Sequence, residues 1–317
     1  IGSEYWEADL IECADNLIEN AIYTASGRSA QSLIIQCANI SNKRALIPAY
    51  TCQHIVEPFD WNGWTVDFYD INKNDLTVNF QSFEEKLTLN PGCIIVQGYY
   101  GFPTAIHIAP YLKKLQEDGI VIIEDITHSF LNNSQMIYDD ADYVFCSLRK
   151  WSGLCDGGYA ISLKGNNLIT PEKPMHNFST DRYMARQTKM EYVKNLNPET
   201  KKKFLELYSK SEDVLDSDIG IYAMSEQAFE DFKHLDLEFI KDTRKANFKF
   251  YLDNINCKYV EPIFKELPSG VCPIMFPVYI EGYRDELRNR LIQERIYCPV
   301  HWPMPIQLDK EARNNNK

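Results

Sequence analysis

The sequence predicts an α/β protein with a large three-layer domain, built on a mostly parallel sheet, and a smaller α+β domain after it. Short apolar runs alternate with helix-like stretches in the first half of the chain. Several of these runs are apolar throughout, as strands are when both faces of a sheet are covered. A chain of 317 residues is also long enough for one large domain and a smaller one.

The expected strands of the large sheet are apolar runs of five to eight residues. They are ALIPAY (45–50), TVDFYD (65–70), CIIVQGYY (93–100), GIVIIED (119–125), DYVFCSL (142–148) and YAISL (159–163). Between them, stretches such as AIHIAPYLKKLQEDG have apolar residues at helical spacing, and Gly119 ends that helix. This alternation predicts an open parallel sheet between two layers of helices.

The second half of the chain has a different pattern. Residues 165–215 begin as a loop and continue as polar helical sequence, and residues 221–255 are expected to form one long amphipathic helix. We therefore expect a large domain over 1–220 and a small one over 221–317, which the long helix enters. The small domain is expected to contain strands at 271–280 and 294–302 around a helix at 284–294.

Composition narrows the classes of function. The net charge of −12 argues against a nucleic-acid-binding surface, which needs clustered Lys and Arg. No apolar run reaches the roughly 18–20 residues of a membrane span. The nine cysteines form no C-x-x-C pair, so no zinc or redox motif is visible and we expect no metal. Reduced cysteines and the absence of a signal-peptide pattern favour a cytoplasmic protein.

A first candidate loop, Ser26-Gly27-Arg28-Ser29, opens a helix where a strand is expected to end. The free N–H groups at a helix start bind anions, and Gly27 lets an anion approach the backbone. Simple capping of the helix by Ser26 is the alternative, and for a motif this short it is the better interpretation when taken alone.

A second candidate is IVIIEDITHS, in which Asp125 ends an apolar strand. A carboxylate there is desolvated unless it faces a cation, and a protonated pyridine nitrogen is such a partner. His128 lies three residues further on and is expected over the same cavity. The alternatives are a helix cap by Asp125 and a core histidine at 128.

The third candidate is FCSLRKWSGLCDGGYAIS, in which Ser147 and Lys150 follow the end of a strand. A partly desolvated lysine has a lowered pKa and acts as a nucleophilic amine. An exposed loop lysine is the alternative. Ligands of open α/β sheets bind at the carboxyl ends of the strands, where all three candidates fall. An anion site, a carboxylate and a lysine on one edge together predict pyridoxal 5'-phosphate (PLP) as cofactor.

These segments resemble the DegT/StrS-type sugar aminotransferases, which have the aspartate aminotransferase fold (fold type I). The similarity covers most of the chain, and Cys52 stands where an aromatic residue usually stacks on the cofactor ring, so that Tyr50 is a candidate substitute. The segments that carry the resemblance are SGRSAQSL, ALIPAYTCQHIVEPFDWNGWTVDFYDIN, IIEDITHS, FCSLRKWSGLCDGGYAIS, YAMSEQAFEDFKHLDLEFIKDTRKAN and CPVHWPMP.

The resemblance assigns roles by position. Lys150 would form the Schiff base with PLP and shuttle protons, Asp125 would pair with the pyridine nitrogen, and His128 would approach the phenolic oxygen. The phosphate-binding residues would be Gly27, Arg28, Ser29 and Ser147. His301 would lie near the mouth of the active site, and Trp151 is a further candidate for the substrate pocket, with simple packing as the alternative.

The function that the resemblance implies is a PLP-dependent transamination. The amino donor would be an amino acid, with glutamate favoured, and the acceptor a nucleotide-linked keto-sugar of polysaccharide biosynthesis. Homodimers with shared active sites are expected. Two alternatives stay open, namely a PLP-dependent dehydratase or lyase on a similar substrate and a non-catalytic binding or regulatory protein.

Overall fold

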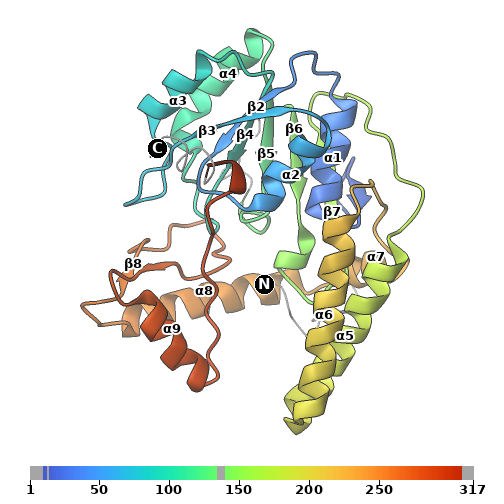
Figure 1. The fold of residues 1–317 in the computed structure, drawn as a ribbon, viewed down its shortest axis with the longest axis vertical. Helices are drawn as coiled ribbons and strands as arrows, with labels where there is room; N and C mark the ends of the chain where they lie inside the picture. Colours follow the sequence, from blue (N-terminus) through green and yellow to red (C-terminus); the bar gives the residue numbers. More distant parts are fainter. Residues whose placement is uncertain (1–9, 13, 134–139, 309–317) are drawn as a thin grey trace.

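The computed structural model describes residues 10–12, 14–133 and 140–308. A sheet of seven strands in the order β1-β7-β6-β5-β4-β2-β3 forms its centre (Figure 1). Only β7 runs against its neighbours, so the sheet is mostly parallel, as expected. The strands are β1 (Ile22–Thr24), β2 (Arg44–Pro48), β3 (Thr65–Tyr69), β4 (Cys93–Gln97), β5 (Val121–Asp125), β6 (Tyr143–Cys146) and β7 (Gly158–Ser162).

Helices cover both faces of this sheet and give the expected three layers. On one face, α1 (Gly27–Cys37) and α2 (Gln53–Trp61) bury Leu33 and Phe59 against the strands. On the other face, α3 (Phe80–Leu87) and α4 (Ala109–Glu117) bury Phe83 and Leu112, with the short turn η1 (Ile106–Ile108) leading into α4. The predicted fold class is therefore confirmed.

All six predicted strands are present, each one to three residues shorter at one end or both. Strand β1 was not predicted because it has only three residues, and its register with β7 depends on a segment far along the chain. The loop and polar helices expected over 165–215 are also present, as the hairpin of α5 (His176–Asn195) and α6 (Pro198–Ser217).

The prediction of a single long helix over 221–255 is wrong. The chain forms α7 (Glu226–Lys233) and α8 (Leu237–Asn254), separated at Leu235. Leu235 is 2% exposed, and Asp236 accepts a hydrogen bond from the Phe239 N–H and caps the new helix. Burial of one leucine together with a strong N-cap thus outweighs helical continuity. The division into 1–220 and 221–317 stays a prediction.

The C-terminal part contains less strand than expected. The run at 271–280 is strand only over β9 (Val278–Tyr279), which pairs with β8 (Glu261–Pro262), because Pro273 and Pro277 cannot donate to a ladder. The helix α9 (Arg284–Gln293) is present, but the strand expected over 294–302 is wrong. That segment is coil, and it leads from α9 back to the large sheet (Figure 1).

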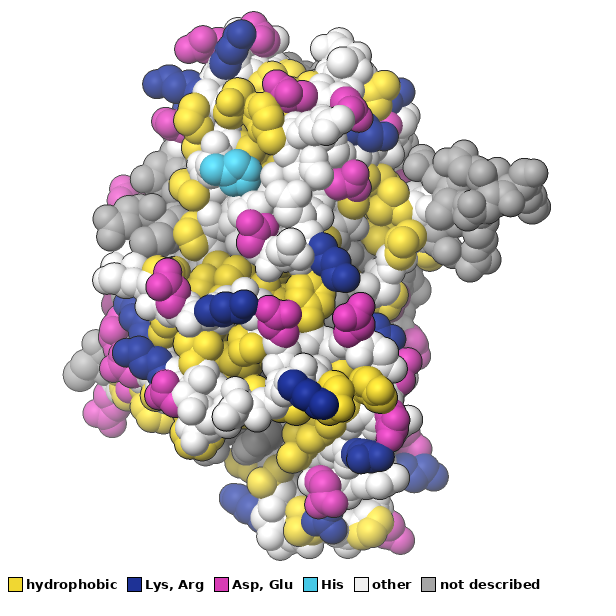
Figure 2. Space-filling view, turned by 90° about the vertical axis from the view of Figure 1, so that its left-hand side faces the viewer, with side chains coloured by type: hydrophobic (Ala, Val, Ile, Leu, Met, Phe, Trp, Pro, Cys, Tyr) yellow, Lys and Arg dark blue, Asp and Glu magenta, His cyan; other side chains and the backbone are white. Residues whose placement is uncertain are grey.

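The surface is mixed in charge on the side that Figure 2 shows, where Lys and Arg side chains are scattered among Asp and Glu with apolar side chains between them. Within the described ranges, no helix combines the length and apolar character that crossing a membrane requires.

Candidate active site

The carboxyl edge of the sheet brings the predicted site residues together. Strands β1, β2, β4, β5 and β6 are parallel, so their C-terminal ends share one edge. Strand β1 leads there into Ser26 and α1, β5 ends at Asp125, and β6 leads into Ser147 and η3 (Leu148–Lys150). Antiparallel β7 starts at this edge, and Gly158 lets it approach closely, since an added Cβ would lie 2.6 Å from the Ser26 carbonyl carbon.

The start of α1 combines the two interpretations that the sequence left open. Ser26 caps the helix, its hydroxyl accepting a hydrogen bond from the Ser29 N–H at 3.1 Å. The N–H groups of Gly27 and Arg28 have no acceptor among the described residues, as expected for a first helical turn. An added Cβ at Gly27 would lie 3.0 Å from the Ser147 Cβ, so glycine lets the helix start sit against Ser147.

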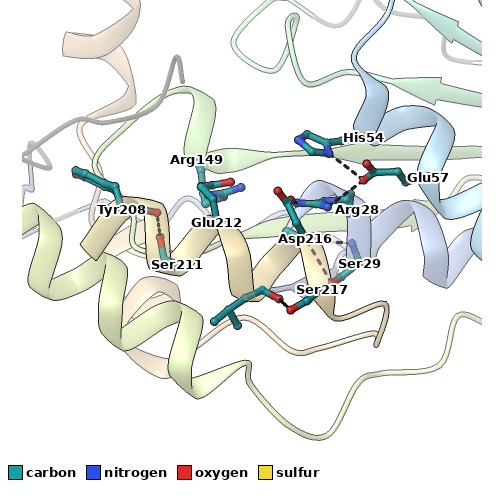
Figure 3. Close-up of polar contacts among 12 residues, drawn as sticks. Arg28, Ser29, His54, Glu57, Arg149, Tyr208, Ser211, Glu212, Asp216 and Ser217 are labelled. Atoms are coloured by element: carbon teal, nitrogen blue, oxygen red, sulfur yellow. Dashed lines mark hydrogen bonds and ion pairs between the residues drawn. The ribbon is translucent and has the colours of Figure 1, made fainter. Parts of the chain in front are cut away.

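The Arg28 side chain turns away from this anion site. Its guanidinium donates to Glu57 Oε2 of α2 at 3.0 Å and to Asp216 Oδ1 of α6 at 2.6 Å (Figure 3). These ion pairs engage the guanidinium, so its proposed contact with a phosphate stays a prediction, whereas its backbone N–H remains at the helix start.

Asp125 is a buried carboxyl group, 7% exposed, at the end of β5. Its Oδ1 accepts a hydrogen bond from the Thr127 N–H at 2.9 Å, and it has no ion pair within the described ranges. Burial raises the pKa of Asp125 to about 6, although hydrogen bonds from Thr127 and the charge of Lys150 act in the opposite direction. A nearby cation would therefore stabilise its charged form.

His128 is a neutral hydrogen-bond donor at the same edge. Its Nδ1 accepts from the Tyr100 N–H at 3.2 Å, which assigns the ring proton to Nε2. The ring stacks on Tyr100 with centroids 5.4 Å apart and on Trp302 at 5.5 Å. Burial, together with the charges of His301 and Lys150, lowers the pKa of His128 to about 3.

Lys150 ends η3, and its amine has no hydrogen bond or ion pair with any residue that the structure describes. Burial lowers the pKa of Lys150, and the charge of neighbouring Arg149 adds to this effect. The charge of Lys150 in turn acts on Asp125, His128 and His301, so all of these groups lie within its electrostatic reach. The alternative interpretation of Lys150 as an exposed loop lysine is therefore wrong.

Ser147 connects the anion site to Asp125. Its N–H donates to the Thr127 Oγ1 at 3.0 Å. Its hydroxyl has no hydrogen bond to a described residue, although the side chain faces the start of α1. Ser147 is therefore placed to donate to a ligand at the helix start.

The C-terminal coil adds His301 and Trp302 to the site. Tyr50 donates to the His301 carbonyl oxygen at 2.8 Å and lies 2.7 Å from the Tyr100 hydroxyl. Burial lowers the pKa of His301 to about 4, and the charge of Lys150 contributes to the shift. His301 thus lies within the electrostatic reach of Lys150, and its place near the mouth of the active site stays a prediction.

Trp151 lies beneath the site. It is 2% exposed, its indole N–H donates to the Thr127 carbonyl oxygen at 2.7 Å, and the Arg244 guanidinium lies 4.9 Å from its ring centroid. These contacts are those of a packing residue, and its role in substrate binding stays a prediction.

A cluster of paired charges borders the site on the side of α6, and we call it the α6 charge cluster. Arg149, which Figure 3 labels beside Glu212, donates to this carboxylate at 3.3 Å. Arg182 donates to the same carboxylate oxygen. Burial raises the pKa of Glu212, but Arg149 and Arg182 outweigh it and the net effect lowers that pKa to about 2. The members of the cluster are Arg28, Arg149, Arg182, Glu212 and Asp216.

Sequence reasoning missed Thr127, Tyr100, Trp302 and the α6 charge cluster. Tyr100 and Thr127 had a usable signal, because Tyr100 ends one predicted strand and Thr127 follows another, at the edge where Asp125 lies. Glu212 and Asp216 had none, since two carboxylates in a polar helix resemble any solvated face. Over the described part of the chain, no group of three or more His, Cys, Asp or Glu side chains is arranged to hold a metal ion.

Comparison with known proteins supports the resemblance. Residues 5–136 match the DegT/DnrJ/EryC1/StrS aminotransferase family, which confirms the similarity noted in the sequence. The matched region contains Gly27, Asp125 and His128 but ends before Lys150, so the fold and not this match places Lys150 with them. No curated protein sequence matches the chain.

Solved structures share the fold at low identity. The Helicobacter pylori PseC aminotransferase, involved in the biosynthesis of pseudoaminic acid, has a TM-score of 0.65 and 13% identity over 95% of this chain and 77% of its own. A DegT/DnrJ/EryC1/StrS aminotransferase from Brucella abortus has a TM-score of 0.56 and 16% identity, over 92% and 73%. A candidate sugar aminotransferase from Streptococcus pneumoniae, in its PLP form, has a TM-score of 0.61 and 14% identity, over 94% and 76%.

Proposed function

We propose that this protein is a PLP-dependent aminotransferase that acts on a sugar. The observation that carries the proposal is the half-buried amine of Lys150, which has no hydrogen bond or ion pair to a described residue and lies at the same sheet edge as Asp125 and His128. A lowered pKa makes an amine a better nucleophile, and a buried carboxyl group at the same edge is stabilised in its charged form by a cation. The family similarity and the shared fold point to the same chemistry.

The residues present fit PLP. The orphan N–H groups of Gly27 and Arg28, with the Ser29 and Ser147 side chains, offer donors to a phosphate at the positive end of α1. Asp125 offers its carboxylate to the ring nitrogen, and His128 offers its Nε2–H to the phenolic oxygen. Lys150 offers a free amine to the aldehyde carbon.

The bound cofactor would supply an electron sink for cleavage of the bond to the substrate's α-hydrogen. The protein's own residues would govern the protons. Asp125 would hold a proton on the ring nitrogen, because a cation there would offset the burial that raises the pKa of this carboxyl group. Lys150, once released, would take the α-proton on its Nζ and return it at the neighbouring carbon, a role that a lowered pKa favours.

The substrates follow from the relatives. We propose that an amino acid, with glutamate favoured, donates the amino group and that a nucleotide-linked keto-sugar accepts it. The Streptococcus pneumoniae neighbour is a candidate sugar aminotransferase, which supports a sugar acceptor. His301 would contact the substrate at the mouth of the site, and we propose a homodimer with shared sites, which sedimentation of the purified protein tests.

The cofactor is tested by absorbance and trapping. Protein supplied with PLP should be yellow, and borohydride should fix the cofactor to a peptide that contains Lys150. Lys150→Ala should abolish trapping and lower turnover by at least about 10²-fold. The matched control Lys164→Ala, at an exposed lysine after β7, should change neither. Trapping in Lys150→Ala at the same peptide would refute the assignment.

The reaction is tested with amino donors. Glutamate should bleach the chromophore and yield 2-oxoglutarate in a half-reaction without acceptor. A bound chromophore that no amino acid bleaches would instead favour a dehydratase or lyase. A protein that binds no PLP at all would indicate a non-catalytic role.

A further inference from the structure

We propose that Thr127 is a positioning residue that links the Asp125 carboxyl group to Ser147 and holds both groups in place through its backbone N–H and its hydroxyl. No comparison assigns a role to Thr127, and it was not among the residues predicted for the site. The proposal rests on the proposed function, since it concerns the groups that would hold the ring nitrogen and the phosphate of PLP.

Three segments of the site meet at Thr127. Its N–H donates to Asp125 Oδ1 at 2.9 Å, at the end of β5. Its Oγ1 accepts from the Ser147 N–H at 3.0 Å, just after β6. Its carbonyl oxygen accepts the Trp151 indole N–H at 2.7 Å, just after η3. Thr127 is 8% exposed, so water does not readily replace these bonds.

The hydroxyl has one donor and two acceptor lone pairs, and this geometry uses both functions. Because Oγ1 accepts from Ser147, its own proton is free to be donated to Asp125, and a side-chain hydrogen bond from Thr127 lowers the pKa of that carboxyl. One oxygen atom therefore links the carboxylate proposed for the ring nitrogen with the serine proposed for the phosphate.

The other groups around Asp125 cannot substitute for this bond. Tyr99, after β4, and Cys146, on β6, lie within the electrostatic reach of Asp125, and burial raises the pKa of each well above its usual value, so neither is charged. Lys150, from η3, is the cation that acts on Asp125. Its amine would be bonded to the cofactor, so it would no longer act as a separate cation beside Asp125. In the described part of the chain, Thr127 is thus the donor to Asp125 that remains when PLP is bound.

The seat of Ser147 depends on the same atom. Ser147 is 8% exposed, and without the Thr127 hydroxyl its N–H would be buried with no acceptor. Gly27 packs directly on the Ser147 Cβ, so a shift of Ser147 would move the start of α1. Loss of the hydroxyl should therefore weaken phosphate binding as well as the charge on Asp125.

The experiment compares Thr127→Val and Thr127→Ala, which lose the hydroxyl, with Thr127→Ser, which keeps it. Isotope-edited infrared spectra of the full chain without cofactor report protonation of Asp125, whose band is identified by its absence in Asp125→Asn. The midpoint of Asp125 protonation should rise by about one pH unit in Thr127→Val and Thr127→Ala and should not change in Thr127→Ser. The dissociation constant of PLP at pH 7.5, titrated by absorbance, should rise about tenfold in the first two variants alone.

A matched control is Thr104→Val. Thr104 is 7% exposed and its Oγ1 also accepts a backbone N–H, that of Tyr99 at 3.2 Å. This variant should lose stability as Thr127→Val does, but leave the Asp125 midpoint in place. If Thr127→Val does not fold, Thr127→Ala, with room for a water molecule, carries the comparison.

An unchanged Asp125 midpoint in a folded Thr127→Ala protein would overturn the proposal, and so would an equal shift in Thr127→Ser. A wild-type protein that binds no PLP would instead refute the proposed function, while the infrared midpoints would still decide the role of Thr127. The two failures are therefore distinguishable.

Discussion

The carboxyl edge of the sheet and the α6 charge cluster are neighbours in space, yet opposite effects dominate the pKa values of their carboxyl groups. At the edge, burial outweighs the nearby charges, so the pKa of Asp125 rises to about 6 and that of His128 falls to about 3. In the cluster, Arg149 and Arg182 outweigh burial, and the pKa of Glu212 falls to about 2. The difference lies in ion pairing, because the charges of the cluster are paired, whereas Asp125 and Lys150 have no ion pair among the described residues.

This contrast distinguishes a structural network from a binding site. Buried charges that are paired stabilise one arrangement of the chain and need no ligand. Burial disfavours the charged form of an unpaired group, and a ligand of opposite charge stabilises that form. Groups with strongly shifted pKa values are therefore common at functional sites. The edge, and not the cluster, is the place where a cationic ring nitrogen would be stabilised.

The largest expected effect is that of Asp125→Asn. Loss of the carboxylate should lower turnover on the order of 10²–10³-fold, because the ring nitrogen would lose the anion that faces it. Burial raises the folded pKa of Asp125 from 3.8 to about 6, so between these pH values stability falls as pH rises. The cofactor-free variant should therefore be more stable than wild type at pH 7.5, by about 1–3 kcal/mol in urea titrations. A less stable variant would contradict this account of the edge.

The next effect concerns His128 and acid. Its folded pKa of about 3 lies below the ordinary value of 6.5, so it binds a proton more readily when unfolded, and its contribution to stability is lost as pH falls below 6.5. His128→Asn, which keeps an acceptor near the Tyr100 N–H, should flatten the loss of stability between pH 6.5 and pH 4 by about 2–3 kcal/mol. The exposed His107→Asn should leave the slope unchanged.

A smaller effect tests the cluster. Glu212→Gln should cost about 1–2 kcal/mol at pH 7, a value reduced because Glu212 is 42% exposed. The folded pKa of Glu212 is depressed, so this stabilisation is present above its ordinary value of 4.5 and is lost as pH falls toward about 2. The control Glu206→Gln, whose pair with Lys202 on α6 is exposed, should cost at most about 0.5 kcal/mol. Equal losses would mean that the cluster is ordinary surface.

The smallest effect is that of Trp151→Phe, which keeps most of the packing and removes the indole N–H donated to Thr127. We expect a loss of about 1 kcal/mol in stability and a KM for the sugar within about twofold of wild type. An increase of about tenfold in KM at unchanged stability would instead place Trp151 in the substrate pocket.

The sequence predicted the large sheet well and the C-terminal part poorly, for one physical reason. Strands such as β4 and β5 are apolar throughout, and that signal is local. The break at Leu235 and the coil over 294–302 depend on tertiary contacts with distant segments, and the local sequence pattern does not contain that information. The short β1 escaped prediction because β7, which holds it, lies far along the chain.

The sequence by itself determined which groups are chemically capable, since strand-end residues such as Asp125 and Lys150 are recognisable from apolar runs that end in a polar side chain. Only the tertiary structure decided what surrounds them. The groups around them come from separate segments of the chain. The Tyr100 N–H assigns the His128 tautomer, and the Thr127 hydroxyl lies between Asp125 and Ser147. The carboxylates of α6 pair with Arg28 and Arg149. Burial and pairing act through space, and they set the charge of each group only once the chain has folded.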